Sequence, residues 1–428
     1  MEPIIHTLKN GLRVIFVDTK TFPTVTTLLL IGAGSRYENE KNNGIAHFFE
    51  HMAFKGSKKY PNSFIISSTI EGLGGVFNAF TSKDHTGYWI KSTVEHFPTV
   101  IDVISDMVLN PILDVTEIER EKGVISEEIN MYEDTPQRKV GELFEELLYK
   151  GNPLGFDIAG QKEGIRKFDR DTFTDYIKSL YHPGNAVLMV AGGLSTHQDI
   201  NFYLKLIEDK FKDWQQGTDS NFIKIEEKQE KPQLLVKYKK TEQAHLVLGF
   251  RTFSFRDERK YALNVLSAIL GGGMSSRLFI QVRERRGLCY YISTGMESYH
   301  DCGSIVTQAG VTIDINKVKE AVKTILIEHK KVADGDINDD ELKRAKELIK
   351  GRFLLSLEDS STIASFYGVK ELLQKKTESP ELLIKKIESV TKEEIINLAK
   401  EIFVSKNLNF TLIGPFEDEA KFKDIINI

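Results

Sequence analysis

The chain repeats itself at a spacing of just over half its length, and this repetition constrains the fold more than any other feature. Residues 116–122 align with 340–346 at an offset of 224, and residues 185–192 align with 407–414 at an offset of 222. Offsets this similar, with the same order of elements around them, indicate a duplicated unit with small insertions. At 428 residues and 41% apolar composition, the chain has ample hydrophobic material for two domains.

The order of elements follows from short apolar runs and helical periods. Strands are predicted at 12–17 and 25–32, which we expect to be antiparallel neighbours, and a second pair at 75–81 and 86–92 is joined by a polar turn. A charged stretch predicts a linker at 216–232 between domains of residues 1–215 and 233–428. The remaining elements of the first domain are helices at 44–54, 97–109, 114–131 and 139–149, and a closing strand at 187–191.

Charge and cysteine content exclude several classes of function. The net charge of -5 comes from 57 basic and 62 acidic residues spread along the chain, so we expect no nucleic-acid and no membrane partner. Cys289 and Cys302 are too few for a disulfide framework and lack the paired spacing of a thiolate zinc site. The first residues resemble neither a signal peptide nor a transit peptide, which predicts a cytoplasmic location.

The segment 44–56 carries the residues with the clearest chemistry. His47, Glu50 and His51 occupy positions i, i+3 and i+4 of a predicted helix, so they share one face. Two imidazoles one turn apart can hold one metal ion, and a carboxylate beside them can take a proton from water. This spacing is the H-x-x-E-H pattern of the inverzincins, and the alternative is two surface histidines with an unrelated glutamate. A catalytic zinc needs a third protein ligand.

The predicted helix 114–131 offers carboxylates for that third position. Glu121 and Glu128 are seven residues apart, so they share a face, whereas Glu127 lies about 100° round the helix from Glu128. Only one of Glu127 and Glu128 can face the metal together with Glu121. A solvated acidic face explains the same spacing, so helix geometry leaves the third ligand open.

Three segments resemble the pitrilysin, insulin-degrading and mitochondrial-processing group of metallopeptidases, in its bacterial-type members of about this length. The segments are 47–56, 78–81 and 119–129, and the resemblance spans both halves of the chain. It implies an α+β fold of two homologous domains, each a mostly antiparallel sheet backed by helices. It also implies zinc as the cofactor, Glu128 as the third ligand, and Glu121 as a residue that orients a ligand histidine or tunes the water.

The second half carries a further part of the resemblance. Arg283 and Tyr290 resemble the arginine and tyrosine, seven residues apart, with which this family holds the substrate backbone. Taken as plain sequence, the same segment is a charged helix end, a glycine cap and a strand start, and Tyr291 is the alternative to Tyr290. We interpret the preceding glycines 271–273 as a helix terminator, because they lack the Lys-Ser/Thr ending of a phosphate loop.

The second half has no H-x-x-E-H pattern of its own. Arg352 takes the place of Glu128 at the offset of 224. Domain 233–428 is therefore expected to contribute substrate-binding residues without binding zinc, whereas domain 1–215 is expected to be catalytic.

Together these features predict a zinc-dependent endopeptidase that acts on unfolded peptides, with Glu50 as the general base. Asn78, Ala79 and Phe80 lie on a strand that we expect at an open sheet edge, where an extended peptide can add. The resemblance also implies a homodimer. The alternatives are a catalytically silent structural subunit and the catalytic subunit of a heterodimer. The intact metal-site positions argue against the first, and the presence of Arg283 and Tyr290 in the same chain argues against the second.

Overall fold

The computed structural model describes residues 2–218, 221–226 and 228–426, and it divides into two compact units. The first unit comprises Met1–Ile129, Phe156–Ile223 and Leu355–Pro380, and the second comprises Asn130–Gly155, Lys224–Leu354 and Glu381–Ile428. Each unit therefore contains segments from both halves of the sequence.

The first unit is built on a six-stranded sheet in the order β1-β2-β6-β3-β5-β4. Its central strands are runs of valine, leucine and isoleucine that are buried on both faces, as a sheet covered on both sides requires. The strands are β1 (Ile4–Thr7), β2 (Arg13–Asp18), β3 (Thr24–Ile31), β4 (Val76–Thr81), β5 (Thr86–Thr93) and β6 (Ala186–Gly192).

The pairing of the first strands corrects one prediction. We expected the strands at 12–17 and 25–32 to be antiparallel neighbours, but β6 lies between them, parallel to β2 and antiparallel to β3. All seven residues of β6 are buried, because a strand this apolar is stable only in the centre of a sheet. The predicted pairing of β4 with β5 is confirmed, and β4 forms the edge of the sheet.

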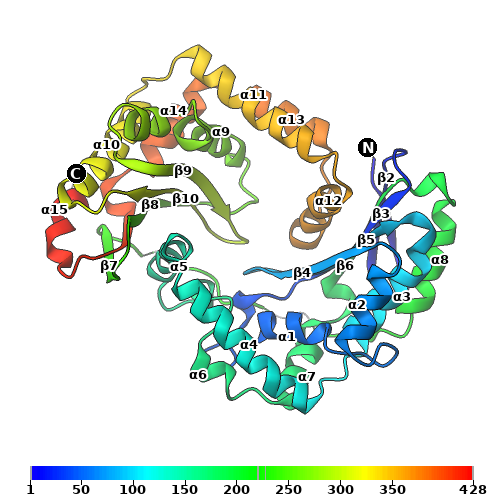
Figure 1. Ribbon diagram of the computed structural model, residues 1–428. Helices are drawn as coiled ribbons and strands as arrows, with labels where there is room; N and C mark the ends of the chain where they lie inside the picture. The colour runs from blue at the N-terminus through cyan, green and yellow to red at the C-terminus, as the bar shows by residue number, and fades with distance from the viewer. Residues whose placement is uncertain (1, 219–220, 227, 427–428) are drawn as a thin grey trace. The chain divides into compact units, whose positions relative to one another are not determined.

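Helices cover both faces of this first sheet (Figure 1). One face packs against α1 (Ile45–Ala53), α3 (Phe97–Leu109), α7 (Arg170–Leu180) and α8 (Ile200–Phe211), and their apolar faces form the larger core of the unit. The opposite face packs against α12 (Ser360–Gln374), which contributes Ile363, Ala364 and Tyr367 to a second core. The sheet is therefore buried on both sides, by helices from different halves of the chain.

The second unit repeats this arrangement with five strands in the order β7-β11-β8-β10-β9. As in the first sheet, one pair is parallel, β7 with β11, and the remaining pairs are antiparallel. One face packs against α9 (Lys260–Gly271), α10 (Ile315–Ala333) and α14 (Lys392–Ile402), and the other against α5 (Pro136–Leu148). The strands are β7 (Gln233–Tyr238), β8 (Ala244–Thr252), β9 (Cys289–Ser298), β10 (Gly303–Val311) and β11 (Leu408–Gly414). The predicted α+β fold of two homologous domains is confirmed.

The helices α5 and α12 are exchanged between the two halves of the sequence. At the offset of 224 residues, Pro136–Leu148 corresponds to positions 360–372, which are α12. Each helix covers the sheet that is built from the other half of the sequence. Because of this exchange, the compact units do not coincide with the sequence domains 1–215 and 233–428. The boundaries of those domains remain a prediction from the sequence repeat. In the predicted linker 216–232, residues 219, 220 and 227 lie outside the described residues, and the rest forms neither helix nor strand.

None of the described helices combines the length and the apolar content that a membrane span requires. The remaining α-helices are α2 (Ser63–Glu71), α4 (Val115–Glu133), α6 (Lys162–Ile165), α11 (Asp339–Ser356), α13 (Pro380–Ser389) and α15 (Lys423–Ile426). The short segments of other helical types are η1 (Ser35–Tyr37), η2 (Val94–His96), η3 (Pro153–Gly155), η4 (Pro183–Asn185), η5 (Leu194–Thr196), η6 (Phe279–Glu284), η7 (Ser405–Asn407) and η8 (Glu419–Phe422).

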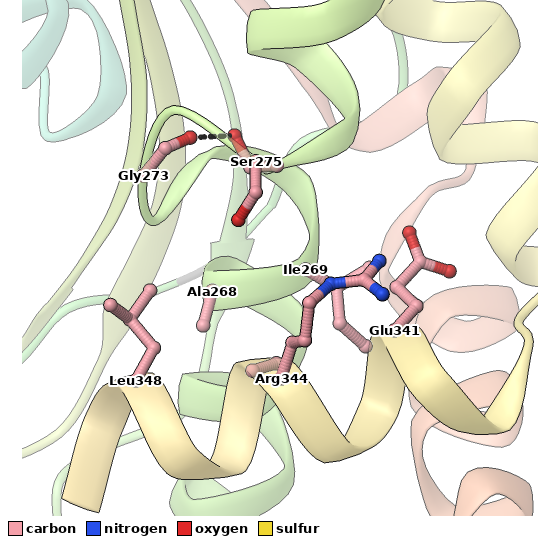
Figure 2. A pocket seen from close by; sticks show the side chains of 9 residues that line it. Ala268, Ile269, Gly273, Ser275, Glu341, Arg344 and Leu348 are labelled. Carbon is pink, nitrogen blue, oxygen red and sulfur yellow. Dashed lines mark hydrogen bonds between the residues drawn. The ribbon is translucent and has the colours of Figure 1, made fainter. Parts of the chain in front are cut away.

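The glycine run 271–273 ends α9. The helix stops at Gly271, and the loop that follows packs beside Arg344 and Leu348 of α11 (Figure 2). The cavity between them has a volume of about 20 Å³, which is room for a single water molecule and not for a phosphate group.

Candidate metal centre

The apolar side chains of helix α1 and its histidines and glutamate lie on different sides of the helix. Ile45, Phe48, Phe49 and Met52 are buried in the core of the first unit. His47, Glu50 and His51 occupy the side that is left, at one-turn spacing, and the rings of the two histidines lie 4.7 Å apart. Burying one stripe of this helix therefore fixes the direction of all three polar side chains.

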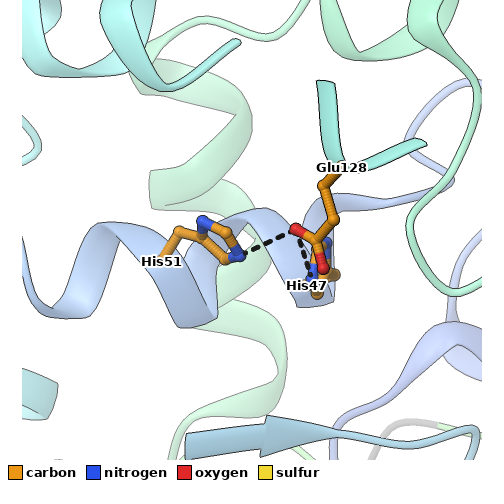
Figure 3. A group of neighbouring side chains, drawn as sticks. All are labelled: His47, His51 and Glu128. Atoms are coloured by element: carbon orange, nitrogen blue, oxygen red, sulfur yellow. Dashed lines mark ion pairs between the residues drawn. The ribbon is translucent and has the colours of Figure 1, made fainter. Parts of the chain in front are cut away.

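The helix α4 brings two glutamates to these histidines. The Oε2 atom of Glu128 lies 3.6 Å from Nε2 of His47 and 3.4 Å from Nε2 of His51. Figure 3 shows the Glu128 side chain reaching from α4 to the two histidines on α1. Glu127, the alternative that helix geometry left open, is exposed. The structure thus brings together Glu128, His47 and His51 from two elements of the same unit.

Glu121 contacts the opposite ring nitrogen of His51. Its Oε1 atom lies 2.8 Å from Nδ1 of His51, and its Oε2 atom lies 2.6 Å from the Lys55 ammonium. This carboxylate is almost fully buried, so both of its oxygens are taken up by these two partners. The contact at Nδ1 leaves Nε2 of His51 directed at Glu128, which is the arrangement that a metal-binding imidazole needs.

The charges around His51 favour a cation at this point. Burial by itself lowers the pKa of His51, but the hydrogen bonds and negative charges of Glu121 and Glu128 outweigh it and raise the pKa to about 9. Burial also raises the pKa of Glu121, and its contacts with His51 and Lys55 reverse this and lower it. The carboxylates therefore stabilise positive charge where the histidine nitrogens converge.

The spacing of the donor atoms fits zinc. Nitrogen and oxygen ligands about 2.1 Å from a tetrahedral zinc lie about 3.4 Å from one another. The distances from Glu128 to the two histidines, 3.6 Å and 3.4 Å, match this separation and exceed that of a good hydrogen bond. Two imidazoles and one carboxylate are also a ligand set of catalytic zinc sites, which leave one position open.

Glu50 is held by the edge strand beside the centre. Its Oε2 atom accepts a hydrogen bond of 2.5 Å from the hydroxyl of Thr81, the last residue of β4. On the same strand, Ala79 is buried, Phe80 packs toward the α12 side of the sheet, and Asn78 is exposed. The edge strand thus presents its free side next to the predicted base.

Arg283 and Tyr290 lie in the second unit and contact one another. Gly310 pairs with Tyr291 and Val311 pairs with Cys289, so Tyr290 is the extra residue of a β-bulge in β9. The bulge leaves Tyr290 72% exposed, with the Arg283 guanidinium 5.7 Å from its ring. Bulges of this kind redirect side chains and are common next to active sites.

The neighbouring Tyr291 packs within the sheet, and its hydroxyl has a partner there. Its hydroxyl lies 3.0 Å from Nδ1 of His245, and its ring lies so close to Gly310 that a Cβ atom there would be 2.3 Å away. Of the two tyrosines that the sequence left as alternatives, Tyr290 is therefore the one whose side chain is exposed.

Two contacts of the centre are not apparent from the sequence. Lys55 and Thr81 both lie inside the segments that carry the resemblance, yet nothing in their local spacing indicates that Lys55 contacts Glu121 or that Thr81 contacts Glu50. Both contacts join segments that are distant in the sequence, so only the packing of α1 against α4 and β4 reveals them.

The chain is similar to known proteins along most of its length. A sequence profile of the family described as Insulinase (Peptidase family M16) matches residues 13–162, and one described as Peptidase M16 inactive domain matches residues 167–349. An uncharacterized zinc protease of Bacillus subtilis is 36% identical over 96% of this chain and 98% of its own length. This chain belongs to the M16 peptidase family. Zinc is the cofactor of that family, as the sequence predicted.

Other M16 relatives show the same relationship along the whole chain. Uncharacterized zinc proteases of Streptomyces coelicolor and Rickettsia felis are 31% and 32% identical over 96% of this chain, and cover 90% and 97% of their own lengths. A crystal structure of a protease from Helicobacter pylori superposes with a TM-score of 0.89, at 24% identity, and covers 97% of this chain and all of that chain. This structural likeness shows that the two chains share a fold.

The M16 profile described as inactive, which matches residues 167–349, ends just before the position in the second half that corresponds to Glu128. At that position, Arg352 on α11 donates a hydrogen bond of 2.6 Å to the carbonyl of Gly272, beyond the end of α9. A guanidinium cannot serve as a metal ligand, because it has no acceptor atom.

Proposed function

We propose that this M16 protein is a zinc-dependent endopeptidase that cleaves unfolded peptides. The convergence of His47, His51 and Glu128, with the Glu128 oxygen 3.6 Å and 3.4 Å from the two histidine nitrogens and Glu50 on the same helix, is the observation that supports the proposal. The three convergent residues would hold zinc, which supplies a Lewis acid that polarises the scissile carbonyl and acidifies water.

The protein's own residues have distinct tasks in this proposal. Glu50 takes the proton of the attacking water and returns it to the nitrogen of the leaving amine. Thr81 holds the carboxylate of Glu50 through a hydrogen bond to Oε2, which leaves Oε1 for the water. Glu121 and Lys55 keep His51 in the tautomer and orientation that point Nε2 toward Glu128.

An extended peptide is the substrate that the edge strand suits. Among the residues that the structure describes, β4 has a partner strand on one side only, so the backbone groups of Asn78, Ala79 and Phe80 can pair with an added strand. In the second unit, Arg283 and Tyr290 offer a guanidinium and an exposed phenol that bind peptide carbonyls, as the family resemblance implies. Main-chain recognition of this kind requires an unfolded segment and favours broad selectivity.

The proposal includes a homodimer, which rests on the family resemblance alone. A catalytically silent subunit is less well supported, because all the metal-site residues and the base are in place. A heterodimeric catalytic subunit is likewise less well supported, because Arg283 and Tyr290 are present in the same chain. Sedimentation of the purified protein at micromolar concentration measures its assembly, and a fully active monomer would remove the dimer from the proposal.

The substitution Glu50→Gln tests the proposed activity. The amide still accepts the hydrogen bond from Thr81 but cannot take a proton from water, so hydrolysis of a mixed peptide library should fall by roughly 10²–10⁴-fold. Zinc content by metal analysis should stay near that of wild type, because Glu50 is not among the convergent ligands. Glu119→Gln, an exposed change on α4, is the matched control and should leave both quantities unchanged. A Glu50→Gln protein that cleaves within a few-fold of wild type would exclude Glu50 as the base.

A further inference from the structure

The carboxylate of Glu38 lies buried at the N-terminus of α1, although Glu38 stands well before the N-cap residue of that helix, Gly44, in the sequence. Its Oε2 atom accepts hydrogen bonds from the backbone nitrogen of Gly44, at 2.8 Å, and from Nδ2 of Asn43, at 2.9 Å. Its Oε1 atom accepts a bond of 2.9 Å from the backbone nitrogen of Ala46. Glu38 is 3% exposed, so these protein donors replace water around the carboxylate.

The first turn of α1 depends on a cap from outside the helix. The N-cap residue is Gly44, which has a φ of 98° and no side chain to cap with, and the first turn contains no acidic residue. Nine residues are too few for a helix that is stable by itself, and helices fray from their ends. A negative charge that accepts N–H bonds at this end opposes the fraying, both by satisfying donors and through the helix dipole.

The position of His47 makes this first turn important for the metal centre. His47 is only the third residue of α1, whereas His51 lies in the last turn. If the first turn frays, His47 leaves the one-turn spacing that places both imidazoles beside Glu128. Loss of helical order at residues 44–47 would therefore separate the proposed ligands while the remainder of α1 stays packed in the core.

The segment that carries Glu38 is itself anchored to the turn after β4. The backbone nitrogens of Ser35 and Arg36 donate to the carbonyls of Ser82 and Lys83, at 3.2 Å and 3.1 Å. The guanidinium of Arg36, which is 1% exposed, forms an ion pair of 3.1 Å with Asp84 in the same turn. Thr81, which holds Glu50, immediately precedes this turn. The segment that carries Glu38 and the turn after β4 are therefore packed together. Glu38 on the first holds the start of α1, and Thr81 beside the second holds the proposed base.

We propose that Glu38 is the positioning residue of the metal centre: its buried carboxylate keeps the first turn of α1 helical and thereby holds His47 in register with His51. This inference rests on the proposed function, in which these two histidines bind zinc. In thermodynamic terms, Glu38 raises the fraction of protein whose ligands are already arranged for the metal, so its loss lowers the apparent affinity by the same factor.

The charge state of Glu38 fixes the pH at which its role is tested. Burial raises the pKa of Glu38 to about 7, against the opposing effect of the hydrogen bonds from Ala46, Gly44 and Asn43. Lys83, from the turn after β4, and Tyr176, from α7, are the titratable groups that face it. At pH 8, which is above this pKa, the carboxylate is mostly ionised and presents its negative charge to the N-terminus of α1.

The test compares Glu38→Gln with Glu40→Gln, an exposed glutamate two residues away. The amide of Glu38→Gln keeps the volume but loses the charge and one of the two acceptor oxygens. In the zinc-free protein at pH 8, hydrogen exchange of the Phe48 amide, which closes the first helical turn on Gly44, should accelerate by about fivefold to tenfold. The dissociation constant for zinc, from competition with a chelator, should rise by about the same factor. At saturating zinc, the turnover number should return to within about twofold of wild type. Glu40→Gln should behave as wild type in all three measurements.

A second control separates positioning from general destabilisation. Tyr203→Phe removes a buried hydrogen bond from α8 to the Leu194 carbonyl, in the same unit, and should lower thermal stability without changing zinc affinity. If Glu38→Gln weakens zinc binding no more than Tyr203→Phe does, or leaves Phe48 exchange unchanged, the proposal is overturned. If Glu38→Gln does not fold, Glu38→Asp, whose shorter side chain withdraws from the helix, decides by the same measurements. A wild-type protein that binds no zinc would contradict the proposed function, whereas the exchange measurement would still decide whether Glu38 orders α1.

Discussion

At the scale of single residues, Glu127 and Glu128 are adjacent in the sequence but face different surroundings. Glu128 reaches the histidines of α1, whereas Glu127 is exposed on α4. We predict that Glu128→Gln weakens zinc binding at least tenfold, because it replaces an anionic ligand with a neutral one. Glu127→Gln, its matched control, should change the affinity by less than twofold. A chelator titration measures both, and the opposite ranking would reassign the ligand.

His329 on α10 predicts how acid destabilises the second unit. It is 3% exposed, and its ring stacks on Phe403 at 4.3 Å. Neither ring nitrogen has a hydrogen-bond partner among the described residues. Burial lowers the pKa of His329 to about 3, whereas a histidine in the unfolded chain has a pKa of about 6.5. Between these values the unfolded chain binds a proton that the folded protein does not, so the free energy of unfolding falls as the pH falls below about 6.5.

The substitution His329→Leu should remove this acid sensitivity. From pH 7.5 to pH 5, the variant should gain about 2 kcal/mol in unfolding free energy relative to wild type. His197→Leu, at an exposed position, is the control and should show no such gain. Denaturant unfolding of the second unit at the two pH values measures the difference. Parallel pH profiles for wild type and His329→Leu would mean that the ring is protonated, or solvated, in the folded protein.

At the scale of elements, α12 shows what the exchange of helices requires of a sequence. It lies on the first sheet at Gly368, where a Cβ atom would be 2.6 Å from Cγ of Met189 and 2.7 Å from Cδ1 of Leu30. At Gly351, within α11, a Cβ atom would have no contact within 4 Å among the described residues, apart from its chain neighbours and the backbone of its own helix. The two glycines therefore form a matched pair for comparison. Close packing requires glycine at position 368, whereas no such packing requires it at position 351.

Alanine at these two glycines should have opposite effects on stability. Gly368→Ala should lower the unfolding free energy by about 1–3 kcal/mol, because the added methyl group displaces buried side chains of β3 and β6. Gly351→Ala should raise it by about 0.5–1 kcal/mol, because alanine favours the helix. Chemical denaturation of both variants measures the pair. A neutral Gly368→Ala would mean that α12 can lift from the sheet without loss.

At the scale of the whole molecule, each unit has its own cores, and the candidate metal centre belongs to the first unit alone. Removing zinc should therefore destabilise one unit selectively. At a free zinc concentration of about a hundred times the dissociation constant, the first unit should gain about 3 kcal/mol of stability. Hydrogen exchange through unfolding of β5 should then be about a hundredfold slower with zinc than with a chelator, while β10 exchanges equally in both. Equal slowing in both strands would show that the two units unfold together.

Local spacing by itself determined much of the candidate metal centre. The positions of His47, Glu50 and His51 within one helical turn are fixed by helix geometry, and the same geometry places Glu121 and Glu128 on one face of α4. The sequence repeat likewise indicated two sheets of one topology, since it records the same order of apolar runs twice. Arg352, in place of Glu128, indicated by its chemistry that the second copy cannot bind zinc in the same way.

The tertiary structure decided the features that depend on partners distant in the sequence. Strand β6 separates β2 from β3, and α12 crosses to the sheet of the other half, because both outcomes are set by which buried surfaces fit together and no local period encodes that. The same holds for Glu38, whose carboxylate caps α1 across a loop rather than from the position before the helix. Sequence by itself specified which residues share a face. Tertiary packing alone decided which helix or strand each face contacts, because the free energy of burial depends on surfaces that the folded chain brings together.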